Sequence, residues 1–271
     1  MREFTMYQVD AFAASVFTGN PAAVLILDTW LPEAEMQAIA AENNLAETAF
    51  VTPKDGGYAI RWFTPTQEAA FCGHATLASA HILTRELKLT DPIRFSTREV
   101  GDLMVMPLGN DTYQMDLPAL APSPLHPIPA VFETLFPKGW VSAVRNFENI
   151  FVELHSPDEV TTCTPDLAAI ETLRPFGLCI TAPGGQRHDG TEVNFVSRYF
   201  APAGGIPEDP VTGSTHATLV PYWAEKLHTP KLRAFQASPR GGTLECRLVG
   251  DRVILTGCAA LFMRATIYLP D

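Results

Sequence analysis

The chain has 271 residues, which is enough for one large domain or two domains of ordinary size. Hydrophobic residues make up 46% of it and charged residues 18%, a composition typical of a well-buried globular protein rather than a disordered or fibrous one. Its 19 basic and 30 acidic residues give a net charge of -11, which argues against nucleic acid and anionic membrane surfaces as partners but leaves room for a small anionic substrate.

The N-terminal segment MREFTMYQVD alternates in the manner of a strand, and its charges argue against a signal peptide. The longest apolar run, PAAVLIL, is far too short to span a membrane. The five cysteines are an odd number and include no CxxC pair. We therefore expect a cytoplasmic protein with reduced thiols and no metal site.

The rest of the first half predicts a helix over 31–44, a hairpin over 51–63, a helix over 73–87 and a hairpin over 103–117. Pro32 and the acidic residues after it suit a helix N-terminus, and the two hairpins turn at Asp55-Gly56 and Gly109-Asn110. The segment 73–87, GHATLASAHILTREL, is small or apolar on nearly every side at its start. Such a helix belongs inside a sheet rather than on a surface.

The second half repeats this plan. The stretch WFTPTQEAAFCGHATLASA, from Trp62, resembles YFAPAGGIPEDPVTGSTHATL, from Tyr199, so that Gly73 and Gly213 are 140 positions apart. Two further glycine pairs, Gly101 with Gly242 and Gly109 with Gly250, are 141 apart. The second half predicts a helix over 164–173, strands over 179–183 and 193–200, a buried helix over 216–227 and a hairpin over 244–257.

This duplication predicts an α+β fold made of two similar domains, each with a curled mixed sheet around a central buried helix. The proline-rich stretch LPALAPSPLHPIP, 117–129, is the expected linker. We place the N-terminal domain at 1–116 and the C-terminal domain at 117–259.

Gly73 and Gly213 are each expected to open a buried helix. A helix start offers free backbone N–H groups and a partial positive charge, which bind carboxylate or phosphate. Either glycine alone could be a tight turn and nothing more, but their repetition favours a pair of anion-binding ends.

Glu47 is the candidate base. It lies in NLAETAFV, between the first helix and a strand and among apolar residues, where a carboxylate is either a surface charge at a helix end or a desolvated base. The matching stretch of the second half, PFGLCITAP, contains no acid. Burial raises the pKa of a carboxyl group towards the working pH, which suits general base catalysis.

Two further polar residues stand beside the two helix starts. Asp209 is flanked by prolines in PEDPVTGSTHA and is either a turn-forming residue or an acceptor that orients a substrate or His74. His74 is either a capping residue or a donor at the anion site. His81 and His216 lie deeper in the two helices and are expected to be core residues.

Four stretches of this chain resemble the signatures of the PhzF-like phenazine-biosynthesis family, in the same order. They are QVDAFAASVFTGNPAAV, AENNLAETAFV, FTPTQEAAFCGHATLASA and APAGGIPEDPVTGSTHA. The resemblance implies a diaminopimelate-epimerase-like fold in which the last strand, within 260–271, returns to the first domain. It also implies an isomerase that transfers a proton without a cofactor, and a homodimer.

The resemblance implies Glu47 as the catalytic acid and base. It implies substrate contacts from Gly73, His74, Asp209, Gly213 and Ser214. The substrate is expected to be a small carboxylate-bearing metabolite, and a shared fold does not fix which one.

Two alternatives remain open at this point. Racemases of the same fold group carry a thiol at each helix start; here Cys72 matches the first and Thr212 stands at the second. An amino-acid racemase or epimerase would then use Cys72 with Glu47 or another group on the opposite face of the substrate. A non-catalytic metabolite-binding or interaction protein that retained the cleft is the other alternative.

Overall fold

The computed structural model describes residues 1–187 and 189–271. The chain divides into two compact units, one made of Met1–Asp116 and Thr256–Asp271, the other of Leu117–Leu255. The C-terminal part of the first unit thus starts at Thr256, inside the long strand β17 (Arg252–Leu269), rather than at the expected position 260.

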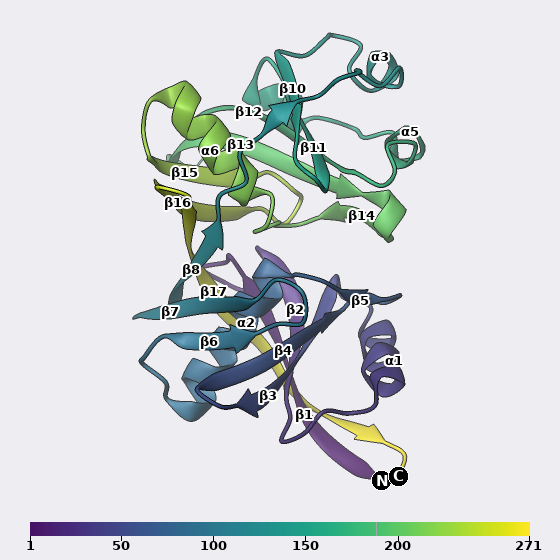
Figure 1. Cartoon of the computed structure of the whole chain (residues 1–271), viewed down its shortest axis with the longest axis vertical. Helices are drawn as coiled ribbons and strands as arrows, with labels where there is room; N and C mark the ends of the chain where they lie inside the picture. The colour runs from purple at the N-terminus through teal and green to yellow at the C-terminus, as the bar shows by residue number, and fades with distance from the viewer. Residues whose placement is uncertain (188) are drawn as a thin grey trace. The chain divides into compact units, whose positions relative to one another are not determined.

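The first unit is a curled mixed sheet with two helices (Figure 1). Its elements in chain order are β1 (Arg2–Ala11), β2 (Asn20–Ile26), α1 (Glu33–Asn43), β3 (Glu47–Lys54), β4 (Gly57–Phe63), β5 (Glu68–Ala69), α2 (Gly73–Leu87), β6 (Ile93–Ser96), β7 (Asp102–Gly109), β8 (Thr112–Pro118) and most of β17. Strand β1 pairs antiparallel with both β17 and β2. Strand β2 runs parallel to β3, β3 antiparallel to β4, β4 parallel to β6, and β6 antiparallel to β7.

The second unit repeats this pairing order. Its elements are β9 (Ser123–Pro124), α3 (Phe132–Leu135), β10 (Ser142–Arg145), β11 (Asn149–Glu153), α4 (Pro157–Thr161), α5 (Leu167–Glu171), β12 (Gly177–Gln186), β13 (Glu192–Ala201), a 3-10 turn (Pro202–Gly204), β14 (Ile206–Asp209), α6 (His216–Leu227), β15 (Lys231–Gln236) and β16 (Gly242–Val249). Strand β10 is antiparallel to β11, β11 parallel to β12, β12 antiparallel to β13, β13 parallel to β15, and β15 antiparallel to β16.

Each unit contains one central helix. In the first unit α2 is buried from Gly73 to Leu83 and contacts β1, β2, β3 and β7 (Figure 1). In the second, α6 packs on β15 and β16, and its Trp223 stacks on Phe195 of β13 with 5.8 Å between ring centroids. The prediction of an α+β fold with a buried helix in each of two similar halves is confirmed.

The structure differs from the predictions made from the sequence in several local details. The hairpin of β7 and β8 turns at Asn110-Asp111, one residue later than expected. The helix expected over 164–173 is the single short helix α5, whose N-terminus is capped by the Asp166 carboxylate accepting from Ala169 N. The short helices α3 and α4 were not predicted. They are too short to show the helical period on which a sequence prediction depends.

The start of α6 also differs from the prediction. The helix begins at His216, and Gly213–Thr215 form a turn in which His216 N donates to Gly213 O at 3.1 Å. The carbonyl of Thr212 instead accepts from the side chains of Thr215, at 2.8 Å, and His216, at 2.9 Å. These side-chain bonds take the carbonyl that would otherwise begin an α-helical ladder, so Gly213 precedes the helix rather than opening it.

Within the described part of the chain, no helix combines the length and the apolar character needed to cross a lipid bilayer.

Candidate active site

Glu47 is the first residue of β3, where it lies opposite Ala22 of the parallel strand β2. Only 8% of its surface is exposed, so it is a buried carboxylate and not a charge at a helix end. It follows a left-handed residue, Asn44, that ends α1 and turns the chain into the strand. The turn therefore places the Glu47 side chain in the interior of the first unit.

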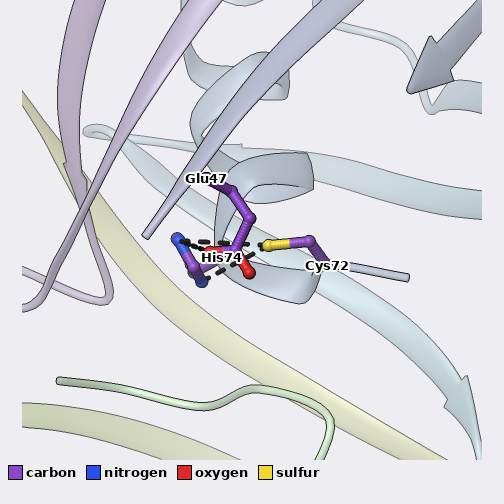
Figure 2. Close-up of side chains that lie close together, drawn as sticks. All are labelled: Glu47, Cys72 and His74. Carbon is purple, nitrogen blue, oxygen red and sulfur yellow. Dashed lines mark hydrogen bonds and ion pairs between the residues drawn. The ribbon is translucent and has the colours of Figure 1, made fainter. Parts of the chain in front are cut away.

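His74 lies against Glu47. Its Nε2 is 3.2 Å from Oε2 of Glu47, and both side chains come together with Cys72 at the start of α2 (Figure 2). Burial lowers the pKa of His74 from 6.5 to about 3, so the imidazole is neutral at physiological pH. Because the imidazole is neutral, the 3.2 Å contact between these two side chains is not an ion pair.

Asn20 fixes which nitrogen of His74 carries the proton. The Asn20 amide nitrogen lies 3.0 Å from Nδ1 of His74, so a donating amide makes Nδ1 the acceptor. The proton of the neutral ring then resides on Nε2, which faces Glu47. Asn20 is fully buried and follows Gly19, whose φ of +65° and close approach to Ala11 O leave no room for a side chain.

The sequence reasoning did not single out Asn20. The signal that could have identified it is the Gly19-Asn20-Pro21 triplet, in which a polar residue stands directly before the apolar run of β2.

Cys72 completes this group. It is the residue before α2, where its side chain makes no capping hydrogen bond, and its Sγ lies 3.5 Å from Nδ1 and 3.9 Å from Nε2 of His74. Ligand-type atoms of Glu47, Cys72 and His74 all lie within 4.8 Å of one another, an arrangement that could hold a metal ion. The prediction of no metal site considered cysteine pairs and did not anticipate this mixed cluster.

The second unit carries a different polar group at the matching place. Asp209, the last residue of β14, is 6% exposed and accepts a hydrogen bond of 2.5 Å from Thr212 Oγ1. Gln236 holds both residues, because its amide nitrogen donates to Asp209 O at 2.7 Å and its oxygen accepts from Thr212 N at 2.8 Å. Gln236 is fully buried on β15 and was not predicted, since nothing local in KLRAFQASP marks it.

Gly213 and Ser214 follow this network in the turn before α6, with Gly213 buried and Ser214 half-buried. The structure thus brings together Glu47, Gly73 and His74 in the first unit, and Asp209, Gly213 and Ser214 in the second. The anion-binding role expected for the two glycines stays a prediction.

Strand register shows that the two halves are chemically unequal. Phe63 of the first unit matches Phe200 of the second in the sequence repeat. Thr48 pairs with Phe63 and Leu178 pairs with Phe200, so the residue before each, Glu47 and Gly177, occupies the equivalent position. A Cβ at Gly177 would lie 2.2 Å from the hydroxyl oxygen of Tyr199, so no acid fits there.

The reverse holds for the other acid. Asp209 pairs with Tyr199 as Ala69 pairs with Trp62, so the first unit has alanine where the second has Asp209. Each half therefore has one acid at a position where the other half has none.

The comparisons with known proteins agree with this architecture. The family model PhzC-PhzF, described as phenazine biosynthesis-like protein, matches residues 9–265. A Pseudomonas aeruginosa protein named an uncharacterized isomerase is 46% identical over 98% of this chain and 100% of its own length. The crystal structure of a PhzF-family phenazine biosynthesis protein from Enterococcus faecalis is 42% identical, with a TM-score of 0.91 over 99% of this chain and 100% of that one.

A hydroxyproline epimerase from Agrobacterium vitis shares the fold alone, with 10% identity and a TM-score of 0.59 over 100% of this chain and 94% of that one. The implied epimerase-like fold is confirmed by these neighbours. The chain belongs to the phenazine biosynthesis-like PhzC-PhzF family and is an isomerase of that family.

Proposed function

We propose that this isomerase moves a proton on a small carboxylate-bearing metabolite, with Glu47 as both base and acid. The observation that carries the proposal is the 3.2 Å contact between Oε2 of buried Glu47 and Nε2 of a neutral His74. A general base needs a carboxylate that is shielded from water and held in one orientation, and this contact supplies the orientation.

The low pKa of His74 defines its role. An imidazole whose pKa is about 3 stays neutral at physiological pH, so it neither forms an ion pair with Glu47 nor takes up the proton that Glu47 removes from the substrate. Glu47 takes a proton from a carbon next to an unsaturated group, and the electron pair of the broken C–H bond moves into that group. The protonated Glu47 then returns a proton to another carbon, which leaves the enzyme unchanged. Solvent hydrogen enters the product whenever the proton on Glu47 exchanges with water before it is returned.

The remaining site residues bind the substrate in this proposal. Backbone N–H groups at Gly73 and His74, where α2 begins, suit a carboxylate or a developing negative charge. In the second unit, Gly213, Ser214 and Asp209 supply a turn, a half-buried hydroxyl and a buried acceptor for the polar groups of the substrate.

The reaction as written balances without a cofactor, and we propose that none is used. We also propose a homodimer in the cytoplasm, with neither nucleic acid nor membrane as a partner. The net charge of -11 supports the exclusion of nucleic acid.

A racemase or epimerase is the second candidate, because Cys72 Sγ lies within 3.5 Å of the His74 ring. A thiolate on one face of the substrate and Glu47 on another would invert a stereocentre. Against this candidate, Thr212 stands where a second thiol would be required, and its hydroxyl is bonded to Asp209.

Solvent deuterium incorporation tests the proposal. A panel of cyclic and amino-acid carboxylates is screened first for binding and then, by NMR, for exchange of carbon-bound hydrogen in D2O. Glu47→Gln should bind the same ligands but exchange them more slowly by about 10²–10⁴-fold, the usual size of an acid–base contribution. Glu42→Gln, an exposed glutamate on α1, is the control and should behave as the unmodified protein.

Exchange that persists in Glu47→Gln would place the base elsewhere. Binding with neither exchange nor formation of an isomer in the unmodified protein, across the whole panel, would favour the non-catalytic alternative.

A further inference from the structure

A buried arginine occurs at the same place in both halves. Arg61 precedes Trp62-Phe63 at the end of β4, and Arg198 precedes Tyr199-Phe200 near the end of β13. A glutamate follows each of them, Glu68 and Glu208, and each glutamate stands five residues before its glycine, Gly73 or Gly213.

The two arginine–glutamate pairs have the same geometry. Arg61 donates from Nε and Nη2 to the two carboxylate oxygens of Glu68, at 2.7 and 2.6 Å. Arg198 donates in the same way to Glu208, at 2.7 and 2.9 Å. Each guanidinium also lies over the aromatic ring two residues ahead, 5.0 Å from the Phe63 centroid and 5.1 Å from the Phe200 centroid.

Both arginines are 7% exposed, so these pairs are unlike the ion pairs of a solvated surface. A buried guanidinium needs good partners, and a two-bond fork to a carboxylate fixes both distance and angle. Lysine offers a single point charge and cannot reproduce that fork.

The third partner of each arginine differs between the halves. Arg61 also bonds Glu33, in the first turn of α1, at 2.6 Å. Arg198 instead bonds two backbone oxygens, Val160 O at 3.3 Å and Cys163 O at 2.6 Å. The two units therefore share the two-bond contact from the arginine to the glutamate that precedes the helix start. The further hydrogen-bond partners of the arginine differ between the units.

In the first unit, the Arg61–Glu68 pair connects the strands that hold Glu47 to the segment that leads to His74. Glu47 lies at the start of β3, which pairs along its length with β4 and so with Arg61. Glu68 lies four residues before Cys72, and His74 returns to Glu47 through the 3.2 Å contact. The distance between His74 and Glu47 thus depends on how firmly the loop 64–72 is held to β4.

The second unit has the equivalent arrangement. Glu208 and Asp209 are consecutive residues on β14, so their side chains point to opposite faces. The fork to Arg198 on one face holds the strand so that Asp209, on the other, meets Thr212.

We propose that Arg61–Glu68 and Arg198–Glu208 are a duplicated pair of positioning groups, each fixing the polar residues at the start of its own unit's central helix. The inference rests on the proposed function only in naming those polar residues as the ones that meet the substrate. Their placement can be tested without any turnover.

The test uses the full-length protein and the variants Arg61→Lys, Glu68→Gln, Arg198→Lys and Glu208→Gln. Hydrogen–deuterium exchange by mass spectrometry follows peptides covering 64–76 and 206–216, and alkylation of Cys72 by N-ethylmaleimide is quantified at that site. The exposed pairs Arg94–Asp102 and Arg233–Glu245 provide matched controls, Arg94→Lys and Arg233→Lys.

Changes at Arg61 or Glu68 should speed exchange in 64–76 and alkylation of Cys72 by roughly tenfold, and should leave 206–216 unchanged. Changes at Arg198 or Glu208 should speed exchange in 206–216 and should leave exchange in 64–76 and alkylation of Cys72 unchanged. Unchanged local rates in all four variants, or equal changes in both peptides, would overturn the proposal, because a merely stabilising ion pair alters global unfolding and not one loop.

The glutamine variants keep the shape of each site, so they preserve the test if a lysine variant does not fold. If the local rates contradict this proposal, the proposed role of Glu47 as base is unaffected. If Glu47→Gln still exchanges substrate hydrogen with solvent, the result on the two arginine–glutamate pairs is unaffected.

Discussion

Nε2 of His74 lies 3.2 Å from Oε2 of Glu47, with both side chains buried in the first unit. The two residues are 27 positions apart in the sequence and belong to a helix and a strand. Because burial lowers the pKa of the imidazole to about 3, the ring that faces Glu47 is neutral at physiological pH.

Replacing Asn20 with Leu should reduce deuterium incorporation into bound substrate by up to about 10²-fold, the cost of misplacing a reacting group. The leucine retains the volume but cannot donate to Nδ1 of His74, so the ring loses its fixed tautomer. Nitrogen-15 NMR of His74 should show the proton on Nε2 in the unmodified protein and a mixture of tautomers in the variant. An unchanged tautomer in Asn20→Leu would contradict the assigned role.

Replacing Cys72 with Ser distinguishes a one-base isomerase from a racemase. If Glu47 is the only base, the proton path is intact and the rate of solvent exchange should change little. If Cys72 is one of two opposed bases, the same change should abolish inversion, because a hydroxyl is a far weaker base than a thiolate. Product formation and the stereochemistry of recovered substrate should be followed together. Loss of all turnover with retained ligand binding would overturn the one-base proposal.

Acid should destabilise the protein through its buried histidines. Burial lowers the pKa of His216 from 6.5 to about 4, so the folded state binds fewer protons than the unfolded chain between these values. The stability that His216 contributes is complete above pH 6.5 and is lost as the pH falls towards 4, which amounts to about 2 kcal/mol at pH 5.

Urea unfolding at pH 7.5 and pH 5.0 measures this loss. His216→Gln removes the titrating group and should reduce the difference between the two pH values by about 2 kcal/mol. The same difference in the variant and in the unmodified protein would show that His216 does not carry the effect.

Gly177→Ala should destabilise the second unit by about 1–3 kcal/mol, the usual cost of overpacking. The added Cβ would lie 2.2 Å from the Tyr199 hydroxyl and 2.7 Å from Asn149 Oδ1, and would disrupt the hydrogen bond between them. Gly185→Ala on the same strand meets nothing within 4 Å and is the matched control. Equal urea midpoints for the two variants would contradict the proposed crowding at Gly177.

The sequence alone was sufficient for the repeated architecture. The buried helix over 73–87 has the predicted bounds, and the helix over 216–227 is present as predicted except that Gly213 precedes it rather than opening it. The hydrogen bonds of a helix are local, and a helix that is apolar on nearly every side at its start has to be buried. The Asp55-Gly56 turn is also as predicted, since a positive φ at Gly56 is a local requirement. The absence of an acid at the position of the second half that is equivalent to Glu47 was visible in PFGLCITAP, although not the crowding at Gly177 that explains it.

Only the tertiary structure decided which polar residues meet. Asn20 reaches His74 across 54 positions, and Gln236 reaches Thr212 across 24, because parallel and antiparallel registers bring distant strand ends together. The arginine–glutamate forks likewise depend on where β5 and β14 fold back onto their neighbours. Sequence periodicity reports which face of an element is buried, whereas the partner of a buried polar group is set by register and chain reversal, which no local pattern encodes.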